Sequence, residues 1–139
     1  MTTRQIVVDA NVFVSFLVDR NEKQRSMAKT LLERAADGEI VAVVTQFAVF
    51  EISYVLQSFY GSPAAEVATL LREMIALPGV AVIDDCPWKR VFEYWPVRVS
   101  GMADRATVAV AIANRYDAVA TFDQKMLKRM QGMGIASYW

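Results

Sequence analysis

Four acidic residues are the side chains in this sequence whose type and spacing best suit catalysis: Asp9, Glu51, Asp104 and Asp123. Carboxylates that are gathered in one place repel each other, and they take up protons unless a cation binds between them. A hard ion with oxygen ligands, such as Mg²⁺ or Mn²⁺, suits such a cluster. We therefore ask whether the fold brings these four acids together.

The chain contains no histidine, and this absence narrows the possible chemistry. It excludes a Ser-His-Asp triad, acid–base catalysis by histidine, and zinc sites built from histidine and cysteine. Cys86 is the one cysteine, and no histidine is present to activate its thiol as a nucleophile. A bound Mg²⁺ or Mn²⁺ polarises a phosphate and lowers the pKa of a bound water without histidine, so phosphodiester hydrolysis remains open.

The elements that must position these acids alternate between strands and helices. Short apolar runs predict strands, and apolar residues at helical spacing predict helices. The predicted strands cover residues 5–8, 40–44, 80–83, 118–121 and 135–137, and the predicted helices cover 11–18, 22–36, 46–59, 63–77, 87–95, 103–116 and 123–130. This alternation predicts an α/β fold in which helices cover both faces of a central parallel sheet, giving three layers. The length suits one domain over residues 1–139.

Such a sheet would place the acids at one edge. Ligands of open parallel sheets bind beyond the carboxyl ends of the strands, where Asp9 and Asp123 follow their predicted strands. Asp104 opens the helix over 103–116, and we expect it to face the same edge. Glu51 lies between Phe47 and Val55, four residues away on either side, and so faces the apolar side of its helix. A buried, ionised carboxylate is costly unless it is paired or bound to a metal.

Each acid has a simpler interpretation when it is taken alone. Asp9, Asp104 and Asp123 each suit the N-cap of a helix, a common role worth about 1 kcal/mol. Glu51 alone could pair with a buried arginine or reach solvent at its helix end. The coincidence of three acids at strand-to-helix junctions with a fourth on a core-facing position favours a shared metal site.

Four segments of the sequence resemble, in order, the motifs of the PIN-domain family. They are Ile6-Val7-Val8-Asp9-Ala10-Asn11, Thr45-Gln46-Phe47-Ala48-Val49-Phe50-Glu51, Ala103-Asp104 with the helix that follows, and Ala120-Thr121-Phe122-Asp123. The resemblance covers essentially the whole chain, and the size is similar to that of VapC-type toxins of toxin–antitoxin pairs. It implies a Mg²⁺- or Mn²⁺-dependent endoribonuclease with the four acids as catalytic metal ligands. It also implies a homodimer and a small antitoxin partner.

Further residues are expected to assist these acids. Asn11 stands where relatives often carry a hydroxyl residue, and its amide is expected to orient Asp9 or a metal-bound water. Thr121, from the fourth motif, is also taken as a supporting residue. Arg105 departs from the small residue usual after the third acid; it either contacts a substrate phosphate or pairs with a surface acid. Lys125 is a candidate contact to the RNA backbone, although most basic residues of its helix suit a solvated face.

Composition adds expectations about partners and location. The 15 basic and 15 acidic residues cancel, but if four acids hold a metal, 15 basic residues face 11 others, which neither supports nor excludes RNA. The 55% hydrophobic content exceeds the ordinary value of about 45–50% and predicts an apolar surface for a dimer or an antitoxin. No apolar run approaches the roughly 18 residues of a membrane span, and no signal peptide is visible. We therefore expect a cytoplasmic protein without membrane contact.

Two other functions compete with the nuclease. A phosphohydrolase of the haloacid-dehalogenase kind also places an aspartate after its first strand, but it needs Asp-x-Asp, and Asn11 occupies the second position. A PIN-like module without catalytic activity would bind RNA or a partner only. The presence of all four acids favours the enzyme.

Overall fold

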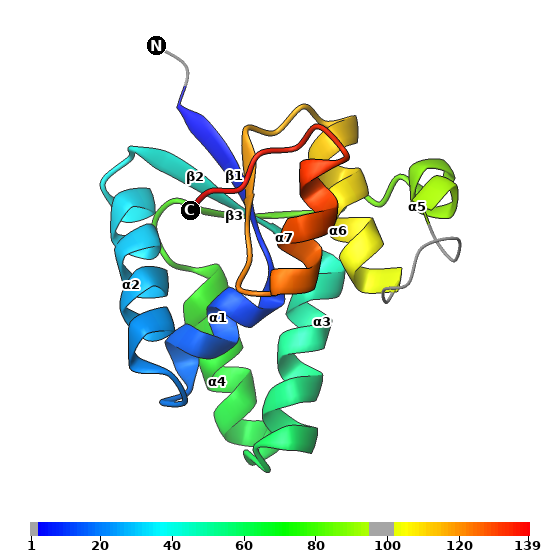
Figure 1. Cartoon of the computed structure of the whole chain (residues 1–139). Coiled ribbons are helices and arrows are strands. Elements are labelled where there is room, and N and C mark those ends of the chain that lie inside the picture. The colour runs from blue at the N-terminus through cyan, green and yellow to red at the C-terminus, as the bar shows by residue number, and fades with distance from the viewer. Residues whose placement is uncertain (1–2, 95–101) are drawn as a thin grey trace.

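A computed structural model of the chain describes residues 3–94 and 102–139 (Figure 1). The strands are β1 (Arg4–Val8), β2 (Ile40–Thr45), β3 (Val80–Ile83) and β4 (Ala118–Ala120). The helices are α1 (Ala10–Leu17), α2 (Glu22–Ala36), α3 (Gln46–Tyr54), the π-helical turn η1 (Val55–Phe59), α4 (Ala64–Ile75), α5 (Trp88–Tyr94), α6 (Met102–Ala113) and α7 (Gln124–Gln131).

The four strands form one parallel sheet in the order β3-β2-β1-β4. Ile6 of β1 pairs with Ala42 on one side and with Ala118 on the other, so β1 lies inside the sheet. The residues of β2 and β4 and the last three residues of β1 are almost all apolar and buried, as expected for a parallel sheet that is covered by helices. Because all the strands run in one direction, their carboxyl ends share one edge.

Alternate residues of the strands serve two separate cores. Ile6 and Val8 pack with α1, α2, α3 and α4, whereas Val7 packs with α6 and α7. This alternation follows from the two-residue period of a strand. The helices therefore cover both faces, and Figure 1 shows α6 and α7 together on the opposite side of the sheet from α1 and α2. The predicted three-layer α/β/α fold with a central parallel sheet is confirmed.

The region after β2 differs from the predicted single helix over residues 46–59. The α-helix begins as expected, where the Thr45 hydroxyl accepts a hydrogen bond from the Ala48 N–H at 3.1 Å. It changes to the wider π-helical turn at Val55. Phe50 of α3 and Phe59 of η1 are 73% and 79% exposed.

Two other predictions differ from the structure, and a third lies outside the residues that it describes. Pro63, which we expected as the first residue of the helix over 63–77, occupies the N-cap position of α4. Residues 135–137 make an isolated bridge between Val119 and Ser137 instead of a strand. The expected end of the helix over 87–95 lies outside the described residues. Within the two described ranges, no helix has both the length and the hydrophobicity that crossing a membrane requires.

The turn between α4 and β3 depends on Gly79. Its φ of +81° is unfavourable for other residues, and an added Cβ would lie 2.1 Å from the backbone oxygen of Ala35. We predict that Gly79→Ala lowers the free energy of unfolding by more than the roughly 1–2 kcal/mol of the backbone conformation alone. Gly61→Ala is the matched control, because Gly61 has a φ of +65° but no atom near its Cβ position. If urea unfolding shows that both variants lose the same free energy of unfolding, the steric argument is contradicted.

Candidate metal centre

Asp9 follows the inner strand β1 and caps α1. Its backbone N–H donates to the Ala120 carbonyl at 2.9 Å, which continues the pairing of β1 with β4. Its carboxylate Oδ1 accepts from the Ala10 N–H at 2.9 Å, so Asp9 is the N-cap residue. The residue is only 6% exposed. Asp9 therefore caps α1, and it is also more deeply buried than an N-cap residue needs to be.

The second carboxylate oxygen of Asp9 is held by two side chains. Thr121 donates its hydroxyl to Oδ2 at 2.8 Å, and Asn11 donates its amide to the same oxygen at 3.1 Å. Asn11 also donates to the Thr121 hydroxyl at 3.1 Å, and its Oδ1 accepts from the Phe122 N–H at 3.1 Å. The amide of Asn11 therefore orients Asp9, in one of the two ways we expected. Three of the roughly four acceptor positions of the carboxylate are used, which leaves one on Oδ1.

Asp123 caps α7 at the end of β4. Its Oδ1 accepts from the backbone N–H groups of Lys125 and Met126, and its own N–H donates to the Thr121 hydroxyl at 3.1 Å. Thr121 thus links the two aspartates through one hydroxyl group. Within the described part of the chain, Oδ2 of Asp123 has no hydrogen-bond donor. This oxygen remains able to bind a cation.

Glu51 and Asp104 reach the same region from two different helices. Glu51 lies in the second turn of α3, and Asp104 is the third residue of α6; both side chains are half-buried. Asp104 therefore lies inside its helix and not at the N-cap position that we considered as an alternative. The charge that shifts the pKa of Glu51 belongs to another acid, Asp104, and not to the buried arginine that we considered as a partner.

Electrostatic repulsion connects all four acids. Burial raises the pKa of Asp9 from its ordinary 3.8 to about 7; the Thr121 hydrogen bond opposes the shift, and repulsion from Glu51 and Asp104 adds to it. Burial and then repulsion from Asp104 raise the pKa of Glu51. Burial and then repulsion from Asp123 raise the pKa of Asp104, against the attraction of Arg129 and Arg105. Shifts of this kind in a cluster of acids are typical of functional sites.

The donor set fits a hard divalent ion, since it consists of carboxylate oxygens around a buried charge. In the described ranges, however, no three such side chains converge at ligand spacing as they stand. Asp9 is fixed by its hydrogen bonds, whereas Glu51 and Asp104 are half-buried. Binding of one ion would therefore require these two side chains to turn toward Asp9.

Arg105 lies elsewhere than we expected, whereas Lys125 lies where we expected it. Arg105 is 2% exposed and its Nη1 lies 3.8 Å from the sulfur of Met133, so its guanidinium is buried and does not lie at the surface, where we expected a phosphate or an acid to meet it. A buried guanidinium next to Asp104 instead lowers the pKa of that acid. Lys125 is exposed on the first turn of α7 and remains a candidate RNA contact. Arg129 was expected only among the basic residues of the helix after Asp123, most of which suit a solvated face, and the structure brings it near Asp104.

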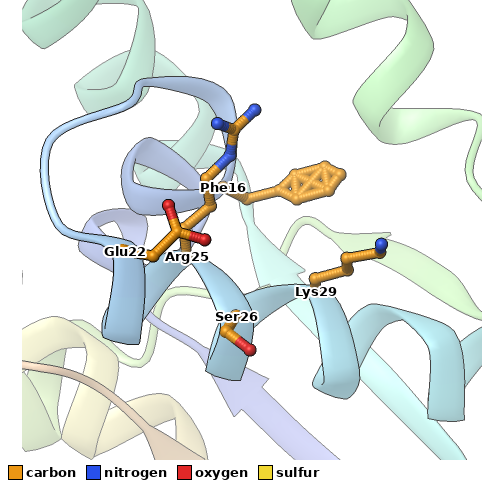
Figure 2. Close-up of a pocket in the computed structure, with 5 residues that line it drawn as sticks. All are labelled: Phe16, Glu22, Arg25, Ser26 and Lys29. Carbon is orange, nitrogen blue, oxygen red and sulfur yellow. The ribbon is translucent and has the colours of Figure 1, made fainter.

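A cavity of about 470 Å³ lies away from these acids. It is lined by side chains of α1 and α2, namely Phe16, Glu22, Arg25, Ser26 and Lys29. Figure 2 shows that Glu22 is the one carboxylate among the five labelled residues. A single acid beside two basic side chains does not suit a divalent cation. This cavity is therefore not a candidate metal centre, although it is large.

The raised pKa values predict how stability depends on pH without divalent metal. The folded state binds a proton at Asp9 more tightly than the unfolded state, so folding loses stability as pH rises from about 4 to about 7. One group contributes at most about 1.4 kcal/mol per pH unit. We expect Asp9→Asn to reduce this loss, measured by urea unfolding in EDTA at about pH 5 and about pH 8. Identical losses in wild type and variant would contradict the burial of an ionising Asp9.

Solved structures with this fold are similar to the chain over nearly its full length. They include VapC20 of Mycobacterium tuberculosis, described as a toxin that cleaves the sarcin–ricin loop (TM-score 0.69, 15% identity, 94% of this chain and 96% of that one). VapBC2 of Rickettsia felis, bound to a DNA fragment from its promoter, has a TM-score of 0.68 at 13% identity, and FitAcB of Neisseria gonorrhoeae has 0.60 at 17%. Each of these two comparisons covers 96% of both chains.

At these identities the structural similarity establishes the fold alone. No curated protein sequence matches this one. A model of the PIN domain matches residues 6–132, a range that contains all four acids. PIN domains are generally nucleases that depend on divalent metal ions. The chain belongs to the PIN-domain family.

Proposed function

We propose that this protein is a Mg²⁺- or Mn²⁺-dependent endoribonuclease in which Asp9, Glu51, Asp104 and Asp123 hold the metal. The observation that carries the proposal is the buried Asp9, whose pKa is raised to about 7 and which is repelled by both Glu51 and Asp104. A divalent ion relieves this repulsion better than protonation at neutral pH, because it neutralises several carboxylates at once. Membership in a family of nucleases supports the same conclusion.

The residues of the chain have separable roles in this proposal. The bound ion would polarise the scissile phosphate and acidify a water molecule. Thr121 and Asn11 hold the carboxylate of Asp9 in one orientation, as partners beyond the metal ligands commonly do. Asp123 stands next to Thr121 and offers Oδ2. The buried Arg105 and the nearby Arg129 limit the repulsion at Asp104.

The solved structures suggest the biological setting. One similar protein is described as a toxin that cleaves the sarcin–ricin loop, and another is a VapBC assembly bound to its promoter DNA. We therefore propose that this chain is a toxin whose substrate is RNA. Its partner would be a small antitoxin that covers the acidic edge of the sheet and so blocks both metal and substrate.

The two rival functions make different predictions. A binding module without activity would show the same fold and no cleavage of RNA. A phosphohydrolase of the haloacid-dehalogenase kind would use a second aspartate at position 11, where the amide of Asn11 is already bonded to Asp9 and Phe122. The family match gives no support to that second rival.

We predict that wild-type protein cleaves a fluorogenic RNA with Mg²⁺ or Mn²⁺ and that EDTA abolishes the cleavage. Asp9→Asn, Glu51→Gln, Asp104→Asn and Asp123→Asn should each reduce the rate by about tenfold or more, because each removes a charge from the metal site. Glu66→Gln, which changes an exposed acid of α4, should cleave like wild type. Circular dichroism would confirm that each variant folds. Full activity of both Asp9→Asn and Asp104→Asn would refute the proposed metal site.

We also propose that the protein forms a two-fold dimer through an aromatic patch, defined as Phe50 and Tyr54 of α3 with Trp88 and Phe92 of α5. These four side chains are between 52% and 73% exposed. Phe50 and Trp88 line one apolar cavity of about 300 Å³, and Trp88 stacks on Phe92 with ring centroids 5.9 Å apart. Large apolar surfaces of this kind mark protein interfaces.

Two helices fit this patch to different extents. The hydrophobic composition predicted an apolar surface without placing it, and the two helices compared here are α4 and α5. α5 carries two members of the aromatic patch, whereas α4 exposes one large hydrophobic residue among its described side chains, Ile75 at 44%. The support for a dimer surface therefore lies on α5 and α3.

We predict that wild-type protein sediments as a dimer at micromolar concentration and that Phe92→Glu shifts it to monomer. A charge placed in a desolvated interface costs more than the contact that it replaces. Phe59→Glu is the matched control, because Phe59 is 79% exposed but lies on η1, outside the aromatic patch. A wild-type protein that stays monomeric at high micromolar concentration would refute the dimer and leave the nuclease unaffected.

A further inference from the structure

Trp139 reaches the segment that carries the metal-binding residues. Its indole N–H donates to the backbone carbonyl of Thr121 at 3.2 Å. Its ring stacks on Phe122 with centroids 5.0 Å apart and an angle of 12° between the planes. Thr121 is fully buried, so its carbonyl needs a partner within the protein. One tryptophan therefore contacts two consecutive residues between β4 and α7.

The segment that carries Trp139 is itself firmly attached to the sheet. The Val119 N–H donates to the Ala136 carbonyl at 2.9 Å, and the Tyr138 N–H donates to the Val119 carbonyl at 3.0 Å. The Tyr138 hydroxyl accepts from Arg34 of α2 at 2.6 Å. In Figure 1 this red segment crosses beside the orange chain that leads into α7. The backbone next to Trp139 is thus held by contacts that do not depend on its hydrogen bond to Thr121.

The contacted residues connect directly to both aspartates. The Thr121 hydroxyl donates to Asp9 and accepts from the Asp123 N–H. The Phe122 N–H donates to Asn11, whose amide donates to Asp9. A shift of the backbone at residues 121–122 would therefore move the partners of Asp9 and the N-cap of α7 together.

We infer that Trp139 is a positioning residue for the metal centre, acting on Asp9 and Asp123 through Thr121 and Phe122. The inference rests on the proposed metal site and adds a residue that none of the four motifs contains. Loss of the indole N–H would leave the Thr121 carbonyl without its donor inside the fold. The carbonyl would then move toward water and take the hydroxyl of the same residue away from Asp9.

The test compares two conservative variants of adjacent residues. Trp139→Phe keeps a ring against Phe122 and removes the donor to Thr121. Tyr138→Phe removes the hydroxyl that binds Arg34 and leaves the donor to Thr121 in place, so it controls for loosening of the segment. The first measurement is amide hydrogen exchange of Phe122 and Asp123 in EDTA, without any metal. The second is the Kd for Mn²⁺ by electron paramagnetic resonance, at a temperature where circular dichroism shows every variant folded.

We expect Trp139→Phe to speed exchange at both amides and to raise the Kd for Mn²⁺ by up to about tenfold. Residues that contact a metal ligand directly change affinity by about 10–100-fold, and Trp139 acts one residue further away. Tyr138→Phe should leave both values as in wild type. A wild-type Kd in Trp139→Phe, or equal effects of the two variants, would overturn the inference. Mn²⁺ binding without RNA cleavage by wild type would refute the proposed nuclease and leave the inference standing. A wild-type protein that binds no Mn²⁺ would refute both.

Discussion

The burial of the Asp9 carboxylate at the end of an inner strand is the constraint on which the rest of the site depends. A negative charge in this place is costly unless donors or a cation surround it. Ala10, Asn11 and Thr121 supply the donors, and they come from the first turn of α1 and from the end of β4. The pKa near 7 shows that these donors compensate only part of the cost of burial and repulsion. A cation would compensate the remainder.

The parallel sheet explains how residues far apart in the sequence come to share this site. β1 lies between β2 and β4, so the chain leaves all three strands at the same edge. From that edge begin α1, α3 and α7, which follow Asp9, Thr45 and Asp123. The start of α6 adds Asp104 to the same region, as its repulsion with Asp123 and Glu51 indicates. Within the described residues, the ends of the strands and the helices that follow them therefore bring the four acids to one region.

The aromatic patch and the segment that contains Trp139 both lie close to residues of the acidic edge. The aromatic patch lies on α3 and α5, and α3 also carries Glu51, so association through the patch would place a partner close to the acids. The segment that contains Trp139 contacts the carbonyl of Thr121, whose hydroxyl donates to Asp9. The geometry at the acids is thus connected both to the aromatic patch and to the hydrogen bond between Trp139 and Thr121.

The sequence by itself determined the alternation of strands and helices, the capping residues Thr45 and Asp123, and the four acids that belong together. These features depend on local patterns: the period of apolar residues, the chemistry of a cap, and the order of short motifs. Only the tertiary structure decided the strand order, the raised pKa of Asp9, the burial of Arg105 and the contact of Trp139 with Thr121. Each of these features depends on which distant segments become neighbours and on how much water these segments exclude. Neither property can be predicted from the residue pattern within a single segment.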